Sequence, residues 1–441
     1  MDSDAANFVI DPFDRRRGKR GSHSPHSSLV SPFHEDAALC ATCHDVSVPV
    51  LDRQPNDTYV HNAFGEPHPT QKKYDMFPGE RTFSEWRESA FARGGVDMGG
   101  RFGGNKPVVS TCQDCHMPDS TSRAAVQGPV RQDMADHGMV GAATWMPRVV
   151  ANLYPDEVDA AALEAGMASA RSMLQRAASM ELSQSGDLLR VRIINETGHK
   201  LPTGQPEGRQ MWINVRFFDA EGRLVAERGA YDDDTGRPKA DDTVMYEIVL
   251  GIDEAVSRAT RLPVGPTHHV AFCNVIYKDN RIPPRGFTNE AYRRVSAPVI
   301  GAGYTDGQYW DDTSYPIPRV AVRASASLYY KTASTEFIEF LRDANRTNDA
   351  GRILYEQWSI TGKSPPVNMV TQEVELATFV CGDFNADRRV DLADYAAFFA
   401  CLAGPDSGPV RPECRPGDLD GDDDVDLADF GRLQGRFGPQ E

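Results

Sequence analysis

The sequence of 441 residues predicts a multidomain α+β protein, because its length exceeds what one hydrophobic core usually serves. Its 30 prolines and 37 glycines favour loops and strands over a helical bundle. Segments of helical periodicity and segments of strand-like alternation occupy different parts of the chain. In chain order we expect a loop-rich region, a linking helix, an antiparallel β-sandwich-like domain, an extension with helices and a strand, and a pair of loop–helix repeats, over 1–150, 151–185, 186–332, 333–378 and 379–441.

The N-terminal region contains the same five-residue pattern twice, as Cys40-Ala41-Thr42-Cys43-His44 and as Cys112-Gln113-Asp114-Cys115-His116. C-x-x-C-H is the attachment signal of a c-type haem. Two thiols about one helical turn apart can add to both vinyl groups of one porphyrin, and the adjacent imidazole then becomes the proximal iron ligand. We therefore predict two covalently attached haems c, the first held by Cys40, Cys43 and His44 and the second by Cys112, Cys115 and His116.

An alternative joins the two C-x-x-C pairs in one four-cysteine zinc site. That site does not require a histidine directly after each pair, and the histidine is present both times, which favours haem. Between the motifs, Thr82-Phe83-Ser84-Glu85 has the form of a capping box and predicts a short helix that continues through Ala92.

A haem that transfers electrons rather than binding substrate needs a sixth iron ligand. The other histidines are His23, His26, His34, His61, His68, His137, His199, His268 and His269. We predict His199, in a turn rich in Gly and Pro, and His137, about 20 residues after the second motif, as distal ligands. For any single histidine, a structural role is the alternative.

The pattern in the middle of the chain predicts one long helix followed by strands. Pro155 lies in the first turn of a helical pattern that we expect to end near Ser185. An Asp219–Gly222 turn joins two of the strands. The strands are expected over 188–194, 211–218, 224–226, 269–277 and 324–330, and two further helices around 336–341 and 353–358.

The last 60 or so residues contain an internal repeat, since 382–395 matches 417–430 at a fixed offset of 35 residues. Positions 1, 3, 5, 9 and 12 of each repeat carry the oxygen ligands of an EF-hand-like calcium loop. These are Asp383, Asn385, Asp387, Asp391 and Asp394 in the first loop, and Asp418, Asp420, Asp422, Asp426 and Asp429 in the second.

We predict two calcium sites, the second tighter than the first. Position 6, normally Gly, is Arg388 in the first loop and Asp423 in the second, and Asp tolerates the required backbone better. The alternative is a solvated acidic tail. A tail would have no reason to keep Val390 and Val425 in the same phase as the ligands.

The cysteines and the net charge indicate the compartment and the kind of partner that we expect for this chain. Cys401 and Cys414 flank a loop rich in Gly and Pro, and we expect them to form a disulfide in an oxidising compartment. The net charge of −17 argues against nucleic acid as a partner and favours a basic redox partner. No run of about 20 apolar residues predicts a membrane span. Met1 is not followed by a signal peptide, although haem c is assembled outside the cytoplasm, so we expect that upstream sequence precedes this chain.

Residues 381–438 resemble a type I dockerin, a module with two such loops, each followed by a helix. The resemblance implies a calcium-stabilised fold and a docking partner. In that family, recognition of cohesin uses a Ser/Thr pair at loop positions 10 and 11, which are Leu392-Ala393 and Leu427-Ala428 here. This departure weakens the implication of cohesin binding and leaves the fold intact.

Residues 30–375 resemble a family of bacterial multihaem c-type cytochromes. The resemblance rests on 112–118, on the Thr-Gly-His-Lys-Leu-Pro-Thr-Gly string at 197–204 and on 278–287. It implies bis-histidine haems stacked close together, and hence an extracytoplasmic electron-transfer protein that is periplasmic, cell-surface or secreted. Two alternatives stay open: an oxidoreductase acting on a small nitrogen or sulfur compound at an open haem, and a secreted binding or scaffold protein.

Overall fold

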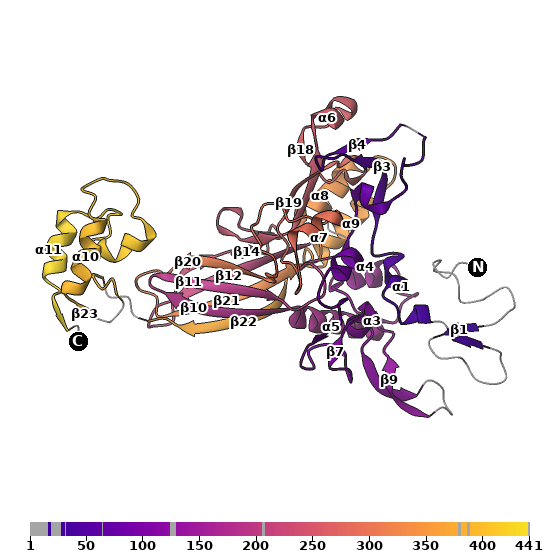
Figure 1. Cartoon of the computed structure of the whole chain (residues 1–441), viewed down its shortest axis with the longest axis horizontal. Helices are drawn as coiled ribbons and strands as arrows, with labels where there is room; N and C mark the ends of the chain where they lie inside the picture. Colours follow the sequence, from indigo (N-terminus) through magenta and orange to yellow (C-terminus); the bar gives the residue numbers. More distant parts are fainter. Residues whose placement is uncertain are drawn as a thin grey trace.

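The computed structural model describes residues 16–18, 28–30, 32–63, 65–123, 129–204, 208–377, 381–385 and 389–439. It is a mixed α and β structure with several antiparallel sheets, in agreement with the predicted α+β class. In Figure 1 the region of the C-x-x-C-H motifs lies at one end of the long central strands, and the C-terminal helices α10 (Leu392–Cys401) and α11 (Leu427–Gln434) lie at the other. No helix among the described residues is long and apolar enough to cross a membrane.

Two antiparallel sheets enclose the main core. One contains β10 (Ala178–Ser185), β11 (Leu188–Asn195) and β20 (Trp310–Pro316). The other runs β13 (Leu224–Arg228), β12 (Gln210–Phe218), β21 (Arg323–Lys331), β22 (Val367–Glu375), with β16 (Met245–Tyr246) also paired to β12. Alternate residues of both sheets, such as Val191, Ile213 and Leu328, are fully buried in one cluster. The alternation of apolar residues therefore predicted β11, β12, β13 and β21 correctly, whereas β10, β16 and β20 were not predicted.

The predicted linking helix was too long. The chain forms α4 (Met146–Leu153) and then α5 (Ala160–Ala177), where the Asp159 side chain accepts the N–H groups of Ala161 and Ala162. Residues 178–185, expected to be helical, form β10 instead. Ala178 and Met180 are buried there, and the strand pairs with β11 in full register, because alternate burial on a sheet outweighs weak helix propensity.

The expected boundary at residue 332 falls inside one sheet. The predicted helices are present as α8 (Thr335–Ala344) and α9 (Ala350–Ile360). They form an insertion between β21 and β22, which pair antiparallel over their length. The segment 333–378 is therefore continuous with the β domain, because β22 completes the sheet that β21 begins.

The remaining elements are short. The strand expected over 269–277 begins only at Val275, because η4 (Val270–Phe272) precedes β19 (Val275–Asp279). Around the motifs and the sheets lie α1 (Ala38–Ala41), α2 (Thr82–Arg87), α3 (Cys112–His116), α6 (Glu254–Thr260), α7 (Asn289–Arg294), η1 (Pro32–His34), η2 (Lys73–Asp75), η3 (Ala240–Asp242) and η5 (Pro412–Gly417). The other strands are β1 (Arg16–Gly18), β2 (Ser28–Val30), β3 (Ser47–Arg53), β4 (Tyr59–His61), β5 (Met76–Pro78), β6 (Val96–Asp97), β7 (Val108–Val109), β8 (Asp119–Arg123), β9 (Val130–Ala135), β14 (Tyr231–Asp232), β15 (Arg237–Pro238), β17 (Ile248–Ile252), β18 (Gly265–Pro266), β23 (Arg389–Val390) and β24 (Gly438–Pro439).

The C-terminal repeats form a small core of their own. Val390, Phe398, Val425 and Leu433 are buried together, as the matched apolar phase of the repeats predicted. The predicted disulfide between Cys401 and Cys414 is confirmed and joins the end of α10 to η5.

Candidate functional site

The second C-x-x-C-H motif is a single turn of helix, α3, with a strong N-terminal cap. The Thr111 side chain accepts the backbone N–H of Asp114, and the Asp114 carboxylate accepts the N–H of Thr111 at 2.9 Å. Lys106 Nζ donates to the same carboxylate at 2.8 Å. This capping box holds Cys112 and Cys115 about one turn apart, the arrangement that the two vinyl groups require.

The first motif straddles the end of α1. Cys40 lies in the helix, and the His44 N–H donates to the Cys40 carbonyl at 2.9 Å. His44 Nδ1 donates to Glu80 Oε1 at 3.1 Å, and this hydrogen bond raises the pKa of His44. His44 is therefore oriented by a carboxylate, as metal-bound histidines commonly are.

The two motifs meet through their first cysteines. The Cys40 and Cys112 side chains are hydrogen-bond partners, and this interaction lowers the pKa of Cys40 to about 7. The four motif cysteines do not converge on one point, however. Within the described ranges, each group of three or more side chains close enough to share a metal consists of aspartates. This arrangement disfavours the four-cysteine zinc alternative.

His199 faces His116, the histidine of the second motif. The ring centres lie 6.4 Å apart and the ring planes differ by 23°. Two imidazole nitrogens bound to one metal, each about 2 Å from it, place their ring centres roughly 6 Å apart. The pair therefore fits the two axial positions of one iron.

Hydrogen bonds select the nitrogen that each ring presents. His116 Nδ1 donates to the Val140 carbonyl at 2.6 Å, and His199 Nδ1 donates to the Lys200 carbonyl at 3.1 Å. Burial lowers the pKa of His116, and it lowers the pKa of His199 to about 4. Both rings are therefore neutral at pH 7 with the proton on Nδ1, so each Nε2 carries the lone pair that a metal needs.

The loop that carries His199 is clamped to the β domain. Asn195 Nδ2 donates to the His199 carbonyl at 2.7 Å and to the Ile282 carbonyl at 2.8 Å. Leu201 and Ile282 exchange both backbone hydrogen bonds, at 2.9 and 3.0 Å. The imidazole thus stands on a rigid support rather than on a free turn.

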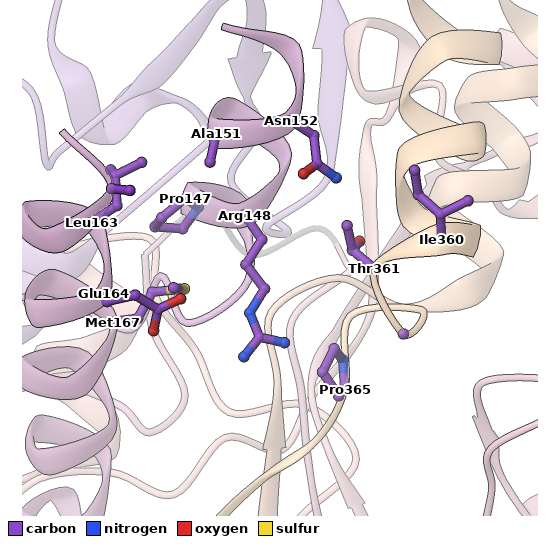
Figure 2. A pocket seen from close by; sticks show the side chains of 12 residues that line it. Pro147, Arg148, Ala151, Asn152, Leu163, Glu164, Met167, Ile360, Thr361 and Pro365 are labelled. Carbon is purple, nitrogen blue, oxygen red and sulfur yellow. The ribbon is translucent and has the colours of Figure 1, made fainter. Parts of the chain in front are cut away.

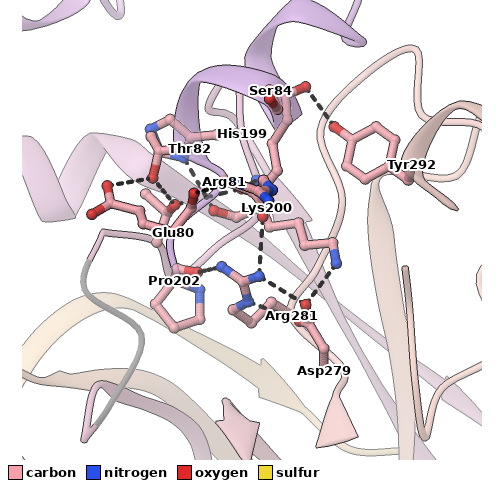
Figure 3. A network of polar contacts seen from close by, with 12 residues as sticks. Glu80, Arg81, Thr82, Ser84, His199, Lys200, Pro202, Asp279, Arg281 and Tyr292 are labelled. Carbon is pink, nitrogen blue, oxygen red and sulfur yellow. Dashed lines mark hydrogen bonds and ion pairs between the residues drawn. The ribbon is translucent and has the colours of Figure 1, made fainter. Parts of the chain in front are cut away.

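Four buried charged side chains are joined at this loop, and Figure 3 labels Lys200, Asp279 and Arg281 among them. Glu85 and Lys200 are fully buried, Asp279 is 2% exposed and Arg281 6% exposed. Asp279 accepts Lys200 Nζ at 2.8 Å and two guanidinium nitrogens of Arg281, each at 2.8 Å. Glu85 accepts Arg281 Nη2 and the Lys200 backbone N–H, each at 3.0 Å. We refer to these four residues as the buried quartet.

The structure around the buried quartet differs from one prediction made from the sequence. The expected capping box from Thr82 to Glu85 is absent: α2 begins at Thr82, and its N-cap residue makes no side-chain cap. The Thr82 hydroxyl donates instead to Glu80 at 3.0 Å and shares a hydrogen bond with the Thr203 hydroxyl at 2.8 Å. The Glu85 carboxylate forms an ion pair with Arg281. A buried guanidinium is a stronger partner for a carboxylate than a helix N–H that water could satisfy. The helix also ends at Arg87, not at Ala92.

The other histidines lie elsewhere. His137 is exposed, and its Nδ1 donates to the Ala135 carbonyl at 3.0 Å; its role as a ligand stays a prediction. His68 is buried beside Asp52, and His268 and His269 pack against Phe340. Predicted candidates His23 and His26 lie outside the described residues.

A hollow of about 580 Å³ lies between α4, α5 and the end of α9 (Figure 2). Pro147, Leu163, Met167 and Ile360 supply its apolar lining, and Arg148 and Glu164 point into it. None of its described lining residues is a cysteine or histidine. The hollow is therefore not lined by the cysteines or histidines of the two C-x-x-C-H motifs.

The second acidic repeat gathers its carboxylates. Oxygens of Asp418, Asp420 and Asp422 lie within 4.8 Å of one another, and so do those of Asp422, Asp424 and Asp429. Burial and the neighbouring aspartates raise the pKa values of Asp420 and Asp424. Asp420 Oδ1 and Asp424 Oδ1 are buried without a hydrogen-bond partner in the described structure. Asp424 was missed by the sequence reasoning, because position 7 of such a loop normally contributes a backbone carbonyl.

The other predicted ligands have local roles in the structure. Asp391 and Asp426 are the N-cap residues of α10 and α11. Asp394 and Asp429 are fully buried and accept backbone N–H groups of their own loops. Asp383 is buried, Asn385 is exposed two residues later, and Asp387 lies outside the described residues. Arg319 of the β domain pairs with Asp418 Oδ2 at 3.3 Å, so the second loop also contacts the rest of the chain.

Comparisons with known proteins add little. No protein-family model matches this chain. No curated protein matches it either. Among solved structures the chain is similar to a penta-heme cytochrome c552 from Thermochromatium tepidum, at 15% sequence identity and a TM-score of 0.41, over 83% of this chain and 73% of that one.

Proposed function

We propose that this chain is an extracytoplasmic multihaem c-type cytochrome that transfers electrons through two covalently attached haems. The observation that carries the proposal is the facing pair of neutral imidazoles, His116 and His199, at 6.4 Å. Each is held by a backbone carbonyl at Nδ1, and one follows directly on a C-x-x-C sequence. Few structural roles require two parallel imidazoles that each present an unprotonated nitrogen in the same space.

The chain's own residues have clear tasks in this function. Cys40 and Cys43 hold the first haem and Cys112 and Cys115 the second, each through two thioether bonds, which fixes the porphyrins to short helical turns. When bound, haem iron supplies a one-electron couple between Fe(II) and Fe(III). With His116 and His199 both bound to its iron, the second haem would be closed to substrate.

His199→Ala tests the axial assignment. The chain is expressed with a secretion signal in a host that matures haem c, and the haems are counted by the pyridine haemochrome method. We expect two haems in both the parent and the variant. In the variant one haem should become high-spin and bind carbon monoxide, because a neutral ligand has been removed without disturbing the thioether bonds.

His61→Ala is the matched control, since His61 is exposed on β4. It should leave the spectrum unchanged. A parent protein with no covalent haem, or a His199→Ala protein whose second haem stays low-spin, would overturn the proposal.

A haem-dependent oxidoreductase acting on a small nitrogen or sulfur compound is the second candidate. One observation favours it: in the described part of the chain, no second imidazole ring packs against His44, whose side chain is 60% exposed. Carbon monoxide binding by one haem of the unmodified protein would place this function first. If carbon monoxide binds neither haem of the unmodified protein, electron transfer remains the proposed function.

We also propose that the C-terminal repeats bind calcium and attach the protein to a docking partner, with the second loop the tighter site. The clustered carboxylates with raised pKa values support this, because a divalent cation would relieve their mutual repulsion. The disulfide and the haem attachment signals favour a periplasmic, cell-surface or secreted location. A basic redox partner suits the net charge of −17.

A further inference from the structure

The buried quartet is unusual in its position. It is removed from water almost completely, and Lys200 is the residue next to His199 in the chain. Burying four charges is expensive, and replacing buried ion pairs with apolar residues of similar volume often leaves stability unchanged or improves it. Stability alone therefore does not account for it.

Two features connect the buried quartet to His199. Glu85 accepts the backbone N–H of Lys200, so one carboxylate fixes the peptide unit that follows the imidazole. Arg281 Nη1 reaches the carbonyl of Pro202 at 3.4 Å, and Lys200 Nζ donates to the Pro298 carbonyl at 2.8 Å. Charged hydrogen bonds thus hold the loop on the C-terminal side of His199, at Lys200 and Pro202, and charged hydrogen bonds are the stronger kind.

The charges also balance. Two carboxylates face one ammonium and one guanidinium, and every charged group has a charged partner within 3.0 Å. The buried quartet therefore fixes the loop without itself adding a net charge beside His199, and the nearby Glu80 carboxylate is hydrogen-bonded to His44. In a medium of low polarity, one uncompensated charge there would act strongly on an iron whose own charge changes by one during electron transfer.

We propose that the buried quartet is a positioning device that holds His199 opposite His116 and, by its neutrality, sets the midpoint potential of the second haem. This inference rests on the proposed function, since it requires His199 to be an iron ligand. The four residues act through His199 and through the local field, and they do not touch the reacting atoms.

Glu85→Gln and Arg281→Gln test the proposal as an opposed pair. The first leaves one excess positive charge and should raise the midpoint potential. The second leaves one excess negative charge, which favours Fe(III), and should lower it. We expect a roughly tenfold change in the oxidised-to-reduced ratio in each direction, and tenfold is 59 mV for a one-electron couple.

The double variant Glu85→Gln/Arg281→Gln restores neutrality and should return the potential close to that of the parent. Spectroelectrochemical titration of the two-haem protein gives the potentials, and the second haem is the one whose signal His199→Ala alters. Arg216→Gln, in an exposed ion pair with Glu227, is the control and should shift neither potential tenfold.

Opposite shifts that cancel in the double variant support the proposal. Shifts of the same sign in both single variants, or none, overturn it and leave the buried quartet a structural device only. If either single variant fails to accumulate, Asp279→Asn replaces Glu85→Gln and Lys200→Gln replaces Arg281→Gln, with the same expected signs. A His199→Ala protein with an unchanged spectrum would instead overturn the proposed function.

Discussion

The imidazoles of His116 and His199 are each oriented by one carbonyl oxygen. Because Nδ1 donates to that carbonyl, the ring cannot turn over without losing the hydrogen bond, and Nε2 is the nitrogen that this bond leaves available. His44 uses a carboxylate, Glu80, for the same purpose. An imidazole that donates to a carboxylate is more basic than an imidazole that donates to a carbonyl. The two proximal histidines should therefore differ in donor strength.

Gly198 is the residue whose size matters most for this geometry. A Cβ at this position would lie 3.1 Å from Trp86 Cδ1 and 3.4 Å from Phe91 Cδ2. We expect Gly198→Ala to lower the free energy of unfolding by about 1 kcal/mol through overpacking. It should also displace His199, which would appear as a high-spin fraction of the second haem in the electron paramagnetic resonance spectrum.

Gly303→Ala is the matched control, because a Cβ there meets nothing within 4 Å. It should change neither stability nor spectrum. Equal behaviour of the two alanine variants would mean that the loop adjusts freely and that its fit against α2 is unimportant.

Among the elements, β11 and β20 are joined by charge as well as by backbone hydrogen bonds. Asp312 on β20 accepts Arg192 Nε at 2.8 Å and Arg190 Nη2 at 2.5 Å. The hydrogen bond with Arg192, together with Arg190, lowers the pKa of Asp312 to about 2. The ion pairs are partly exposed, so water screens much of their energy.

This pair gives a pH dependence with a definite sign. The folded pKa of Asp312 lies below its ordinary value of 3.8, so its contribution to stability is present above pH 3.8 and is lost as the pH falls through about 2. Asp312→Asn should lower the free energy of unfolding by about 1 kcal/mol or less at pH 7. Denaturant titrations should show the difference from the parent shrinking between pH 4 and pH 2. A difference independent of pH would contradict the assignment.

At the scale of the whole molecule, the acidic repeats lie at the far end of the sheets from the C-x-x-C-H motifs (Figure 1). They have their own buried cluster and disulfide, and Arg319 links them to the β domain. Calcium should therefore stabilise this module with little effect on the haem region.

Asp422 belongs to both groups of carboxylates in the second loop, so it is the residue to remove. Calcium at about 100 times its dissociation constant should stabilise the module by about 2.7 kcal/mol. Asp422→Asn should abolish most of this gain, measured by calorimetry on the full chain. Asp241→Asn, outside the repeats, should keep it. A calcium-dependent change in the haem spectrum of the parent would show that the two ends are coupled.

Most of the order of motifs and strands along the chain could be predicted from local sequence patterns. The C-x-x-C-H strings, the 35-residue repeat and the strands over 188–194, 211–218 and 324–330 are properties of short windows, where spacing alone decides which side chains share a face. The disulfide between Cys401 and Cys414 was also predictable, because the two cysteines flank one short loop. Helix ends were less predictable: residues 178–185 are strand because β11 lies beside them.

The sequence by itself determined the chemistry available to this protein: two haem attachment signals, a set of histidines and two acidic loops. The tertiary structure alone decided which of those groups meet. His116 and His199 are 83 positions apart in the chain, and Glu85 and Arg281 are 196 apart, so no local pattern relates them. The reason is physical: burial removes water as a competing partner, and a carboxylate such as Glu85 then binds the nearest buried cation rather than the helix N–H groups that its sequence neighbours offer.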